Sequence, residues 1–403
     1  MANIFYKLAH RLHKGSKDFL DIPVDREREF LESLPEPISD LQRSYSQYLC
    51  QNFYRSKTMI WTLNAISALL TPFAILLLLA KGVFCKKENV SFDVECDLGN
   101  FKDVVPAALQ EEFRIDYDNW FSSMSLCLSD VPFLLHVCAF RPMSCFFALK
   151  CVLKVGYYSD MIRRYSLKAV ITHNEYAFTS TALTAYCENC GVEHINVMHG
   201  EKLYYIRDSF FRFSRSYVWD EHYKDLFVSL RADAGQFVIY MPKAMKIDIA
   251  SHISPEDYAD VKYYLQIYNR SQLETIAASM DALKKKGFSV KYRPHPRYSD
   301  IAMLEEVVGP DAIEYPSRVS TQTSVSNVKI AAGSFTTVLN QAYTSGKEVL
   351  LDDVAYPKRV AKLAARGYIF SGNTKNCHLL STFIEKHEKD NKEISGSPLS
   401  EKS

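Results

Sequence analysis

Residues 168–198 read KAVITHNEYAFTSTALTAYCENCGVEHINVM and predict a complete strand–helix–strand unit. We expect a buried strand at Lys168–Thr172, a helix at Phe178–Cys190 and a second strand at His194–Met198. Gly191 ends the helix, because glycine accepts the left-handed backbone that commonly follows a helix. A helix between two strands makes the strands parallel.

Further strands are expected along the chain, and they alternate with helical segments. The strands are Ser216–Trp219, Phe237–Met241, Ser289–Tyr292, Ala312–Tyr315, Asn327–Ala331 and Glu348–Leu351. The helices begin near Glu221 or lie within Tyr258–Lys286, Ile301–Val308 and Thr336–Thr344. Alternation of this kind predicts parallel sheets covered by helices. We therefore predict an α/β protein with two Rossmann-like domains facing a central cleft, and an apolar helical segment near the N-terminus.

The expected elements also suggest domain boundaries. We predict an N-terminal part at residues 1–106, a first Rossmann-like domain at 107–230 and a second at 231–385, with a linker between Asp220 and Gln236. The tail at 386–403 is charged and then rich in serine and glycine, which is typical of disorder.

Composition excludes several classes of protein. The chain has 403 residues, enough for two domains, and a net charge of +1 gives no indication of nucleic-acid binding. Ten cysteines in so long a chain do not form the disulfide framework of a small secreted protein, and we expect reduced cytosolic thiols. Cys187 and Cys190 have CxxC spacing, but no second pair stands at the distance of a zinc site.

One segment has the composition of a membrane contact. Met59–Ala80 is 22 residues without a charge, which satisfies the length of a spanning helix. Pro72 lies in its middle, and lysine or arginine residues stand on both flanks, so the positive-inside rule gives no orientation. We favour a helix pair broken at Pro72 that dips into one leaflet, over a true span or a buried core helix. The protein is accordingly predicted at the cytoplasmic face of the inner membrane.

A dense group of donors follows one of the predicted strands. Lys291–Arg297 reads KYRPHPR, and the carboxyl ends of strands are where open α/β sheets bind ligands. Guanidinium and imidazole groups suit a phosphate, while prolines stiffen the backbone that carries them. The residues predicted to bind the donor here are Arg293, His295, Pro296 and Arg297. The alternative is a stiff turn with solvated arginines.

A second phosphate loop is expected where Asn327–Ala331 runs into Gly333 and a helix begins. Helix N-termini bind anions through free N–H groups and the helix dipole. Hydroxyl groups add further donors at Ser334, Thr336 and Thr337. The alternative is an ordinary helix cap formed by Ser334.

Histidines and a carboxylate follow two neighbouring strands of the first domain. His173 and Glu175 come after one strand, and His199 and Gly200 close the next, with Lys202 shortly after. A carboxylate beside histidines at a sheet edge is the composition of a general base. The alternative is that these groups cap the local helix and strand. Asp352 and Asp353 after a later strand are typical of a turn, and no metal is expected.

The order of these motifs resembles the GT-B fold glycosyltransferases of bacterial surface polysaccharide assembly. More narrowly, it resembles enzymes that use CMP-activated sugars: sialyltransferases, polysialyltransferases and capsule Kdo transferases. The resemblance covers about Lys168 to Asp353 and implies that His295-Pro296 matches the family's His-Pro motif, whose histidine contacts the donor phosphate. It also implies that the family's serine or threonine motif matches Ser334, Thr336 and Thr337, which would bind the phosphate or the donor's carboxylate.

The resemblance leaves the general base open. The sialyltransferase base belongs to an acidic motif that this chain lacks, so Glu175 is expected on position alone, with His173 as the alternative. His199-Gly200 is closer to the pattern of capsule enzymes and CDP-glycerol polymerases. Gly200 and Lys202 are expected to line the acceptor side.

The expected function is transfer of a sugar, sialic acid from CMP-sialic acid, onto a glycan or lipid-linked glycan in capsule, O-antigen or lipooligosaccharide synthesis. The resemblance implies no cofactor beyond the nucleotide-sugar substrate. Three alternatives stay open: a CDP-glycerol or CDP-ribitol phosphotransferase of teichoic-acid type, a UDP-sugar transferase, and a catalytically inactive GT-B scaffold.

Overall fold

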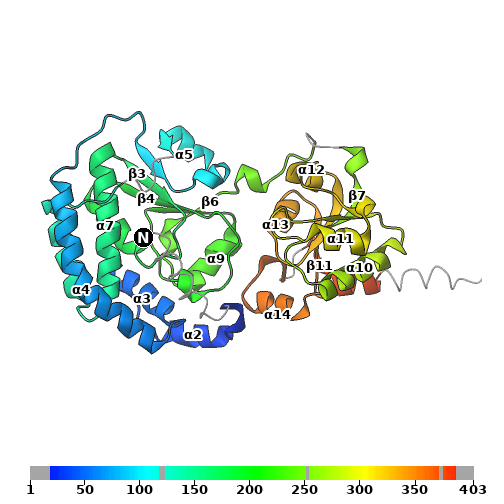
Figure 1. Cartoon of the computed structure of the whole chain (residues 1–403), viewed down its shortest axis with the longest axis horizontal. Helices are drawn as coiled ribbons and strands as arrows, with labels where there is room; N and C mark the ends of the chain where they lie inside the picture. The colour runs from blue at the N-terminus through cyan, green and yellow to red at the C-terminus, as the bar shows by residue number, and fades with distance from the viewer. Residues whose placement is uncertain (1–18, 118–122, 251–253, 372–374, 387–403) are drawn as a thin grey trace, which may run out of the picture. The chain divides into compact units, whose positions relative to one another are not determined.

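The computed structural model describes residues 19–117, 123–250, 254–371 and 375–386. The chain divides into two compact units, Met1–Pro242 (unit 1) and Lys243–Ser403 (unit 2) (Figure 1). Each unit has its own parallel sheet with helices packed on it, which confirms the predicted α/β class. The expected cleft between two domains stays a prediction.

The sheet of unit 1 is parallel throughout, in the order β2-β1-β3-β4-β5-β6. Its strands are β1 (Val94–Cys96), β2 (Ile115–Asp116), β3 (Ala169–Thr172), β4 (Glu193–Val197), β5 (Arg215–Val218) and β6 (Phe237–Ile239). The helices are α2 (Val24–Ser33), α3 (Asp40–Asn52), α4 (Lys57–Gly82), α5 (Ala107–Glu112), α6 (Val131–Phe140), α7 (Cys145–Tyr165), α8 (Ser180–Asn189) and α9 (Glu221–Ser229). Because every strand points the same way, all carboxyl ends meet at one edge.

Alternation along β3 places apolar side chains on both faces of this sheet. Ala169 and Ile171 pack into a cluster that contains Leu109 of α5, whereas Val170 packs with Val152 of α7 and Leu183 of α8. Burial on both faces explains why β3 is an uninterrupted apolar run in the sequence. Gly191 ends α8 with a φ of +69°, as predicted.

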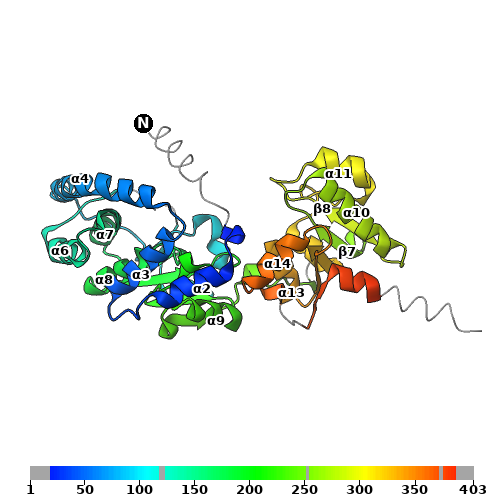
Figure 2. The ribbon, with the colours of Figure 1, turned by 90° about the horizontal axis from the view of Figure 1, so that it is seen from below.

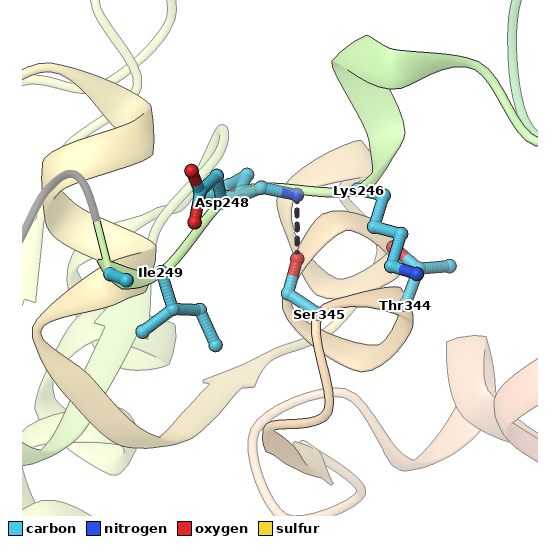
Figure 3. A pocket seen from close by; sticks show the side chains of 7 residues that line it. Lys246, Asp248, Ile249, Thr344 and Ser345 are labelled. Atoms are coloured by element: carbon cyan, nitrogen blue, oxygen red, sulfur yellow. Dashed lines mark hydrogen bonds between the residues drawn. The ribbon is translucent and has the colours of Figure 1, made fainter.

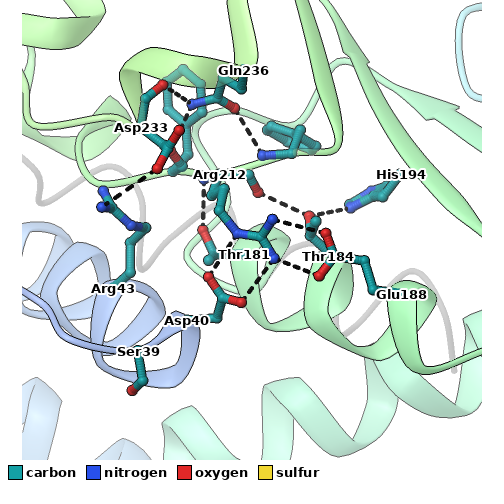
Figure 4. Close-up of polar contacts among 12 residues, drawn as sticks. Ser39, Asp40, Arg43, Thr181, Thr184, Glu188, His194, Arg212, Asp233 and Gln236 are labelled. Atoms are coloured by element: carbon teal, nitrogen blue, oxygen red, sulfur yellow. Dashed lines mark hydrogen bonds and ion pairs between the residues drawn. The ribbon is translucent and has the colours of Figure 1, made fainter.

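The N-terminal helices belong to unit 1 rather than to a separate N-terminal part. Arg212 lies between the carboxylates of Asp40 in α3 and Glu188 in α8, at 2.7 and 2.7 Å (Figure 4). Arg43, one turn further along α3, donates to the carbonyl of Arg231 at 2.8 Å. These contacts join segments that lie far apart in the chain, and β1 pairs directly with β3. A boundary at residue 106 is therefore not a structural one.

His194 in β4 gives unit 1 a pH-dependent stability. Its ring is fully buried, and its Nε2 lies 3.0 Å from the Tyr158 hydroxyl. Its Nδ1 lies 2.8 Å from the Thr184 hydroxyl (Figure 4). Burial lowers the pKa of His194 from 6.5 to about 3. The unfolded chain therefore binds a proton below pH 6.5 that the folded chain refuses until about pH 3, so stability falls as the pH drops through this window.

Because of His194, we expect the free energy of unfolding to fall by about 2 kcal/mol when the pH is lowered from 7 to 5. Urea unfolding of the wild-type chain and of His194→Gln at both pH values measures this, and the variant should lose about 2 kcal/mol less on acidification. His378→Gln, at an exposed histidine, is the matched control and should leave the difference unchanged. Equal losses in wild type and His194→Gln would contradict the prediction.

Helix α4 is one continuous element that runs through Pro72. The predicted helix pair broken at Pro72 is wrong. Proline removes the backbone donor to the Ala68 carbonyl, and the Thr71 hydroxyl next to it donates to a different carbonyl, that of Ser67, at 2.7 Å. Within the described ranges, α4 is a helix long and apolar enough to cross a membrane, by length and composition. Since 11% of its most apolar window is buried, the core-helix interpretation is also wrong.

Unit 2 has a second parallel sheet, in the order β11-β10-β9-β7-β8. Its strands are β7 (Ala259–Tyr264), β8 (Val290–Arg293), β9 (Val328–Gly333), β10 (Glu348–Leu351) and β11 (Cys377–Leu379). The helices are α10 (Arg270–Lys284), α11 (Ile301–Val308), α12 (Thr321–Ser326), α13 (Thr337–Thr344) and α14 (Pro357–Ala365). Strand β10 and helix α11 have the predicted bounds.

Several predicted elements need correction. Tyr258–Lys286, expected to be helical, begins with the strand β7, and α10 follows it. The strand at Phe237–Met241 is β6, which pairs with β5 and ends unit 1 rather than opening the second domain. The unit boundary therefore follows Pro242, and the predicted linker region holds α9 instead.

One further predicted strand differs from the structure, and the predicted tail is not described by it. The strand expected at Ala312–Tyr315 is reduced to a single bridge between Ile313 and Tyr292. The tail predicted to be disordered, apart from Lys386, lies outside the described residues.

Candidate functional site

The two predicted phosphate loops of unit 2 open at the same edge of its sheet. In β7, Tyr264 pairs with Arg293 of β8, and Tyr263 pairs with Ala332 of β9. Strand β7 thus separates the two motif-bearing strands, which places their ends about 10 Å apart at the usual strand spacing. A Cβ on Gly333 would lie 3.1 Å from the Tyr264 carbonyl oxygen, so glycine suits this close approach of two backbones.

His295 lies in the loop after β8 with a defined orientation. Its ring stacks on Tyr298 at 4.4 Å between centroids, and its Nδ1 accepts the Arg297 backbone N–H at 3.1 Å. That contact leaves the proton of a neutral ring on Nε2. Burial, with help from the Arg297 charge, lowers the pKa of His295 below 6.5. The ring is therefore neutral at pH 7 and offers one N–H donor.

The two arginines of this loop differ in their surroundings. Arg293 is buried, and its guanidinium donates to Glu314 at 2.8 Å and to the Val319 carbonyl at 2.9 Å. Lys262 of β7 contacts the other oxygen of the same carboxylate. These contacts are those of a structural residue, and a direct role of Arg293 in donor binding stays a prediction. Arg297, by contrast, is exposed on the loop.

The loop after β9 leads into helix α13, as predicted, but with a different cap. Thr336 is the capping residue, and its hydroxyl accepts the Val338 N–H at 3.4 Å. The alternative interpretation, a cap formed by Ser334, is therefore wrong. Ser334 is largely buried and Thr337 is exposed at the first position of the helix. The loop keeps the N-terminal N–H groups of α13 at the strand edge, where an anion is favoured.

Arg359 is a cation at this edge that the sequence interpretation missed. It lies near the start of α14, and its guanidinium carbon is 5.5 Å from the ring centroid of Phe335, in the loop after β9. Its Nε is buried and has no hydrogen-bond partner within the described residues. The available signal was its position in the first turn of a helix that follows β10, the strand next to β9.

The acidic pair after β10 has structural contacts. Asp352 accepts hydrogen bonds from the Tyr263 hydroxyl and from the backbone N–H groups of Val354 and Ala355. Asp353 accepts from the hydroxyl and backbone N–H of Ser381. No group of three His, Cys, Asp or Glu side chains in the described ranges could hold a metal ion.

A surface hollow in unit 2 lies away from these loops. Its lining includes Lys246, Thr344 and Ser345, and the Ile247 N–H donates to the Ser345 hydroxyl at 2.9 Å (Figure 3). This is the C-terminal end of α13, where the helix dipole is negative and disfavours an anion. The hollow is therefore separate from the candidate phosphate site.

In unit 1, three adjacent strands bring polar side chains together at their carboxyl ends. Asp97 directly follows β1, His173 directly follows β3, and His199 lies two residues beyond β4. The rings of His173 and His199 are in edge contact, with centroids 4.4 Å apart. His173 Nδ1 is 3.8 Å from the Asp97 carboxylate, and Asn174 donates to the same oxygen at 3.4 Å. The sequence interpretation predicted both histidines and missed Asp97.

Burial tunes the members of this group differently. It raises the pKa of Asp97, against the pull of His173. Burial also lowers the pKa of His199 from 6.5 to about 3, reinforced by Lys202 and His173. His199 is therefore neutral at physiological pH, and His173 is the histidine that faces a carboxylate. The Asp97 carboxylate lies too far from His173 Nδ1 for a hydrogen bond, but its charge can stabilise the imidazolium that forms when a histidine acts as a general base.

Glu175 and Lys202 form a buried ion pair with each other. Gln47 of α3 reinforces this region, since its amide donates to the Glu175 carbonyl at 2.7 Å and to the Arg207 carbonyl at 2.9 Å. The pair fastens the loop after β4 to the loop after β3. Glu175 as the base stays a prediction, but its contacts favour a structural role, and those of Lys202 do as well.

Gly200 does not need to be glycine for its backbone conformation. Its φ lies outside the left-handed region, and a Cβ there would meet nothing within 4 Å. The chain therefore leaves β4 without a backbone conformation that requires glycine. The position is half-buried beside His199, so Gly200 keeps open space at this edge of the sheet.

No family model matches the chain, and no curated protein matches it. Among solved structures, it is similar to the lipopolysaccharide outer core galactosyltransferase WaaB in its apo form, at 15% identity and a TM-score of 0.35, covering 62% of this chain and 72% of that one. It is similar to the glycotransferase of kitacinnamycin at 11% identity and a TM-score of 0.40, covering 76% and 90%. A UDP-N-acetylglucosamine 2-epimerase from Rickettsia bellii matches at 13% identity and a TM-score of 0.38, covering 75% and 95%. Similarities this low assign neither an activity nor a substrate.

Proposed function

We propose that the chain is a glycosyltransferase that moves sialic acid from CMP-sialic acid onto a glycan or lipid-linked glycan acceptor in bacterial capsule, O-antigen or lipooligosaccharide synthesis. We place it at the cytoplasmic face of the inner membrane. One observation carries the proposal: the loops after β8 and β9 bring His295 and the start of α13 to one edge of a parallel sheet. Donors gathered there suit the phosphate of a nucleotide.

The proposed reaction is a single displacement. An acceptor hydroxyl attacks the anomeric carbon of the donor, forming a new C–O bond as the bond from that carbon to the phosphate oxygen breaks. The hydroxyl proton passes to His173, whose imidazolium is stabilised by Asp97 at 3.8 Å. CMP leaves as an anion and takes the electron pair of the broken bond.

The loops after β8 and β9 carry donors that would stabilise that leaving group. The Nε2–H of neutral His295 donates to a phosphate oxygen, and the N–H groups at the start of α13 donate to another. Two arginines add positive charge near these donors: Arg297 in the loop after β8, and Arg359, which lies over the ring of Phe335 in the loop after β9. Preorganised donors aimed at developing charge are commonly the largest catalytic contribution.

The donor is tested by incubating the purified chain separately with CMP-sialic acid, CMP-Kdo, CDP-glycerol and UDP-sugars, each with a lipooligosaccharide acceptor. Release of CMP together with labelled sialic acid in the acceptor supports the proposal. Turnover with CMP-Kdo alone would change the donor sugar, and turnover with UDP-sugars alone would overturn the CMP assignment. The His295→Ala variant, which should be about a hundredfold slower, is compared with the wild type in each arm.

A CDP-polyol phosphotransferase is the second candidate, because two separate loops carry donors suited to phosphate. Their strands lie on either side of β7, so the side chains of both loops can reach one diphosphate placed at the end of β7. CDP-glycerol carries two phosphates, whereas CMP-sialic acid carries one. Incorporation of labelled glycerol phosphate into a polyol acceptor, without sialic acid transfer, would select this candidate.

A further inference from the structure

Helix α4 exposes an apolar face that covers most of its length. Its outward side chains include Trp61 at 72% exposure, Phe73 at 71% and Leu69 and Leu77 nearby, and Val83 and Phe84 continue it past the helix end. We call these six residues the α4 face. Soluble proteins rarely expose a contiguous apolar surface of this kind without a partner.

The opposite side of α4 is docked along α7. Near the start of α4, Asn64 accepts the Phe146 N–H at 3.0 Å, and near its end the Leu78 carbonyl accepts the Leu126 N–H at 2.9 Å. Leu78 also packs against Gly156 of α7, where a Cβ would lie 2.9 Å from its side chain. Figure 2 shows α4 on the outside of unit 1, with α7 on its inner side. The α4 face is therefore the outer surface of a helix held flat on the unit.

This docking argues against a helix that spans the bilayer. A spanning α4 would draw α7 into the hydrocarbon, and α7 carries Lys150, Lys154, Asp160, Arg163 and Arg164. Charged side chains inside a bilayer are strongly disfavoured. A helix lying parallel to the surface instead inserts its apolar side and leaves α7 in water.

The charges beside the α4 face identify the kind of surface it fits. From residue 55 to residue 87 the chain contains no Asp or Glu, but five cations, at Arg55, Lys57, Lys81, Lys86 and Lys87. The segment 131–159, which holds α6 and most of α7, likewise lacks acidic residues. Apolar side chains bordered by cations on both ends complement an anionic headgroup layer.

We propose that unit 1 docks on an anionic lipid bilayer through the α4 face, with α4 lying in the plane of the interface and its flanking lysines among the headgroups. This names the surface residues behind the proposed membrane location, and it does not depend on the transfer reaction. An acceptor anchored in a membrane would then be met by diffusion in two dimensions.

Vesicle flotation of the full chain tests the proposal. We expect binding to vesicles of phosphatidylglycerol and phosphatidylethanolamine, weaker binding to phosphatidylcholine, and loss of binding as salt rises, because surface charges are screened. Leu69→Ser/Phe73→Ser/Leu77→Ser should lower the bound fraction about tenfold. The matched control, Ile38→Ser/Ile267→Ser, removes exposed apolar side chains outside the α4 face and should bind as wild type.

Trp61 reports the depth of docking. Its fluorescence should shift to the blue and be quenched by lipids brominated on the acyl chains, and Trp61→Phe should remove that signal. The proposal would be overturned if the wild-type chain did not float or if the triple variant floated normally. It would also be overturned if the chain resisted carbonate extraction and Lys57 and Lys81 were found on opposite sides of the bilayer. Self-association through the α4 face without vesicle binding would overturn it as well. The triple variant should release CMP with a soluble acceptor at the wild-type rate. This assay therefore tests the proposed transfer reaction, and flotation tests the proposed docking, independently of each other.

Discussion

Replacing His173 with alanine is expected to lower kcat for sugar transfer by about a thousandfold, within the range that general bases contribute. The KM for the donor should change little, because the proposed base acts on the acceptor hydroxyl and not on the donor phosphate. His173 follows β3 at the carboxyl edge of the sheet, with Asp97 at 3.8 Å and the His199 ring at 4.4 Å. Steady-state kinetics with CMP-sialic acid and a soluble acceptor measure both constants.

Asp97→Asn separates positioning from proton transfer. It keeps the size of the side chain but removes the charge that stabilises the imidazolium, so kcat should fall by about a hundredfold. The donor KM and the midpoint of thermal unfolding should stay close to those of wild type. A merely structural Asp97 would instead lower the unfolding midpoint and leave kcat per folded molecule unchanged.

Glu175→Gln decides between the two candidate bases. Glu175 is buried against Lys202, so the substitution leaves a buried ammonium without its counterion and should lower stability. If Glu175 is structural, kcat per folded molecule falls far less than in His173→Ala. A thousandfold loss in Glu175→Gln at unchanged stability, with an active His173→Ala, would assign the base to Glu175 and contradict our assignment.

The ends of several strands in both sheets could be predicted, because these strands are short apolar runs bounded by polar residues or glycine. Strand β10 is buried at Val349, Leu350 and Leu351 and was predicted with the same bounds. Strands β3 and β4 were predicted to within a residue at each end, which placed His173 and His199 at the same edge. The hydrophobic pattern therefore located the histidines before their contacts were known.

Strand β7 of unit 2 could not be predicted from its own residues. Lys262 stands in the middle of β7 and is fully buried, although a hydrophobic pattern predicts an exposed position there. Its charge is compensated by Glu314, which lies 52 residues away in the chain. Burial of a lysine thus depends on a partner that no local window contains.

Asp97 and Arg359 were missed for related reasons. Strand β1 has three residues and offers no periodicity from which to infer an end, so Asp97 was not recognised as a residue at the sheet edge. Arg359 lies in a helix, and its position over Phe335 depends on the pairing of β10 with β9. The pairing of β6 with β5 could not be predicted either, because the hydrophobic pattern identifies a strand but not the sheet to which it belongs.

Replacing His295 with alanine is expected to lower kcat by about a hundredfold, the usual effect of removing one donor to a developing anion. His295 is neutral at pH 7, since burial and Arg297 lower its pKa below 6.5, and its Nδ1 accepts the Arg297 N–H. The ratio of wild-type to His295→Ala activity should therefore stay constant from pH 7 upward. It should change only below pH 6.5, where protonation of Nδ1 breaks the contact with Arg297. The measurement is kcat for CMP release across this pH range.

The arginines distinguish a phosphate site from a stiff surface turn. If the loop binds the donor, Arg297→Gln and Arg359→Gln should each raise the donor KM, by about tenfold, with little change in stability, because neither side chain has an ion pair to lose in the described structure. Arg293→Gln should act differently, since it leaves Glu314 to Lys262 alone and lowers the free energy of unfolding. A turn without a ligand predicts the same loss of stability for Arg293→Gln, but wild-type kinetics for His295→Ala, Arg297→Gln and Arg359→Gln. The kinetics of the three variants, compared with the stability of the fourth, therefore decide whether the donors after β8 and β9 hold a phosphate.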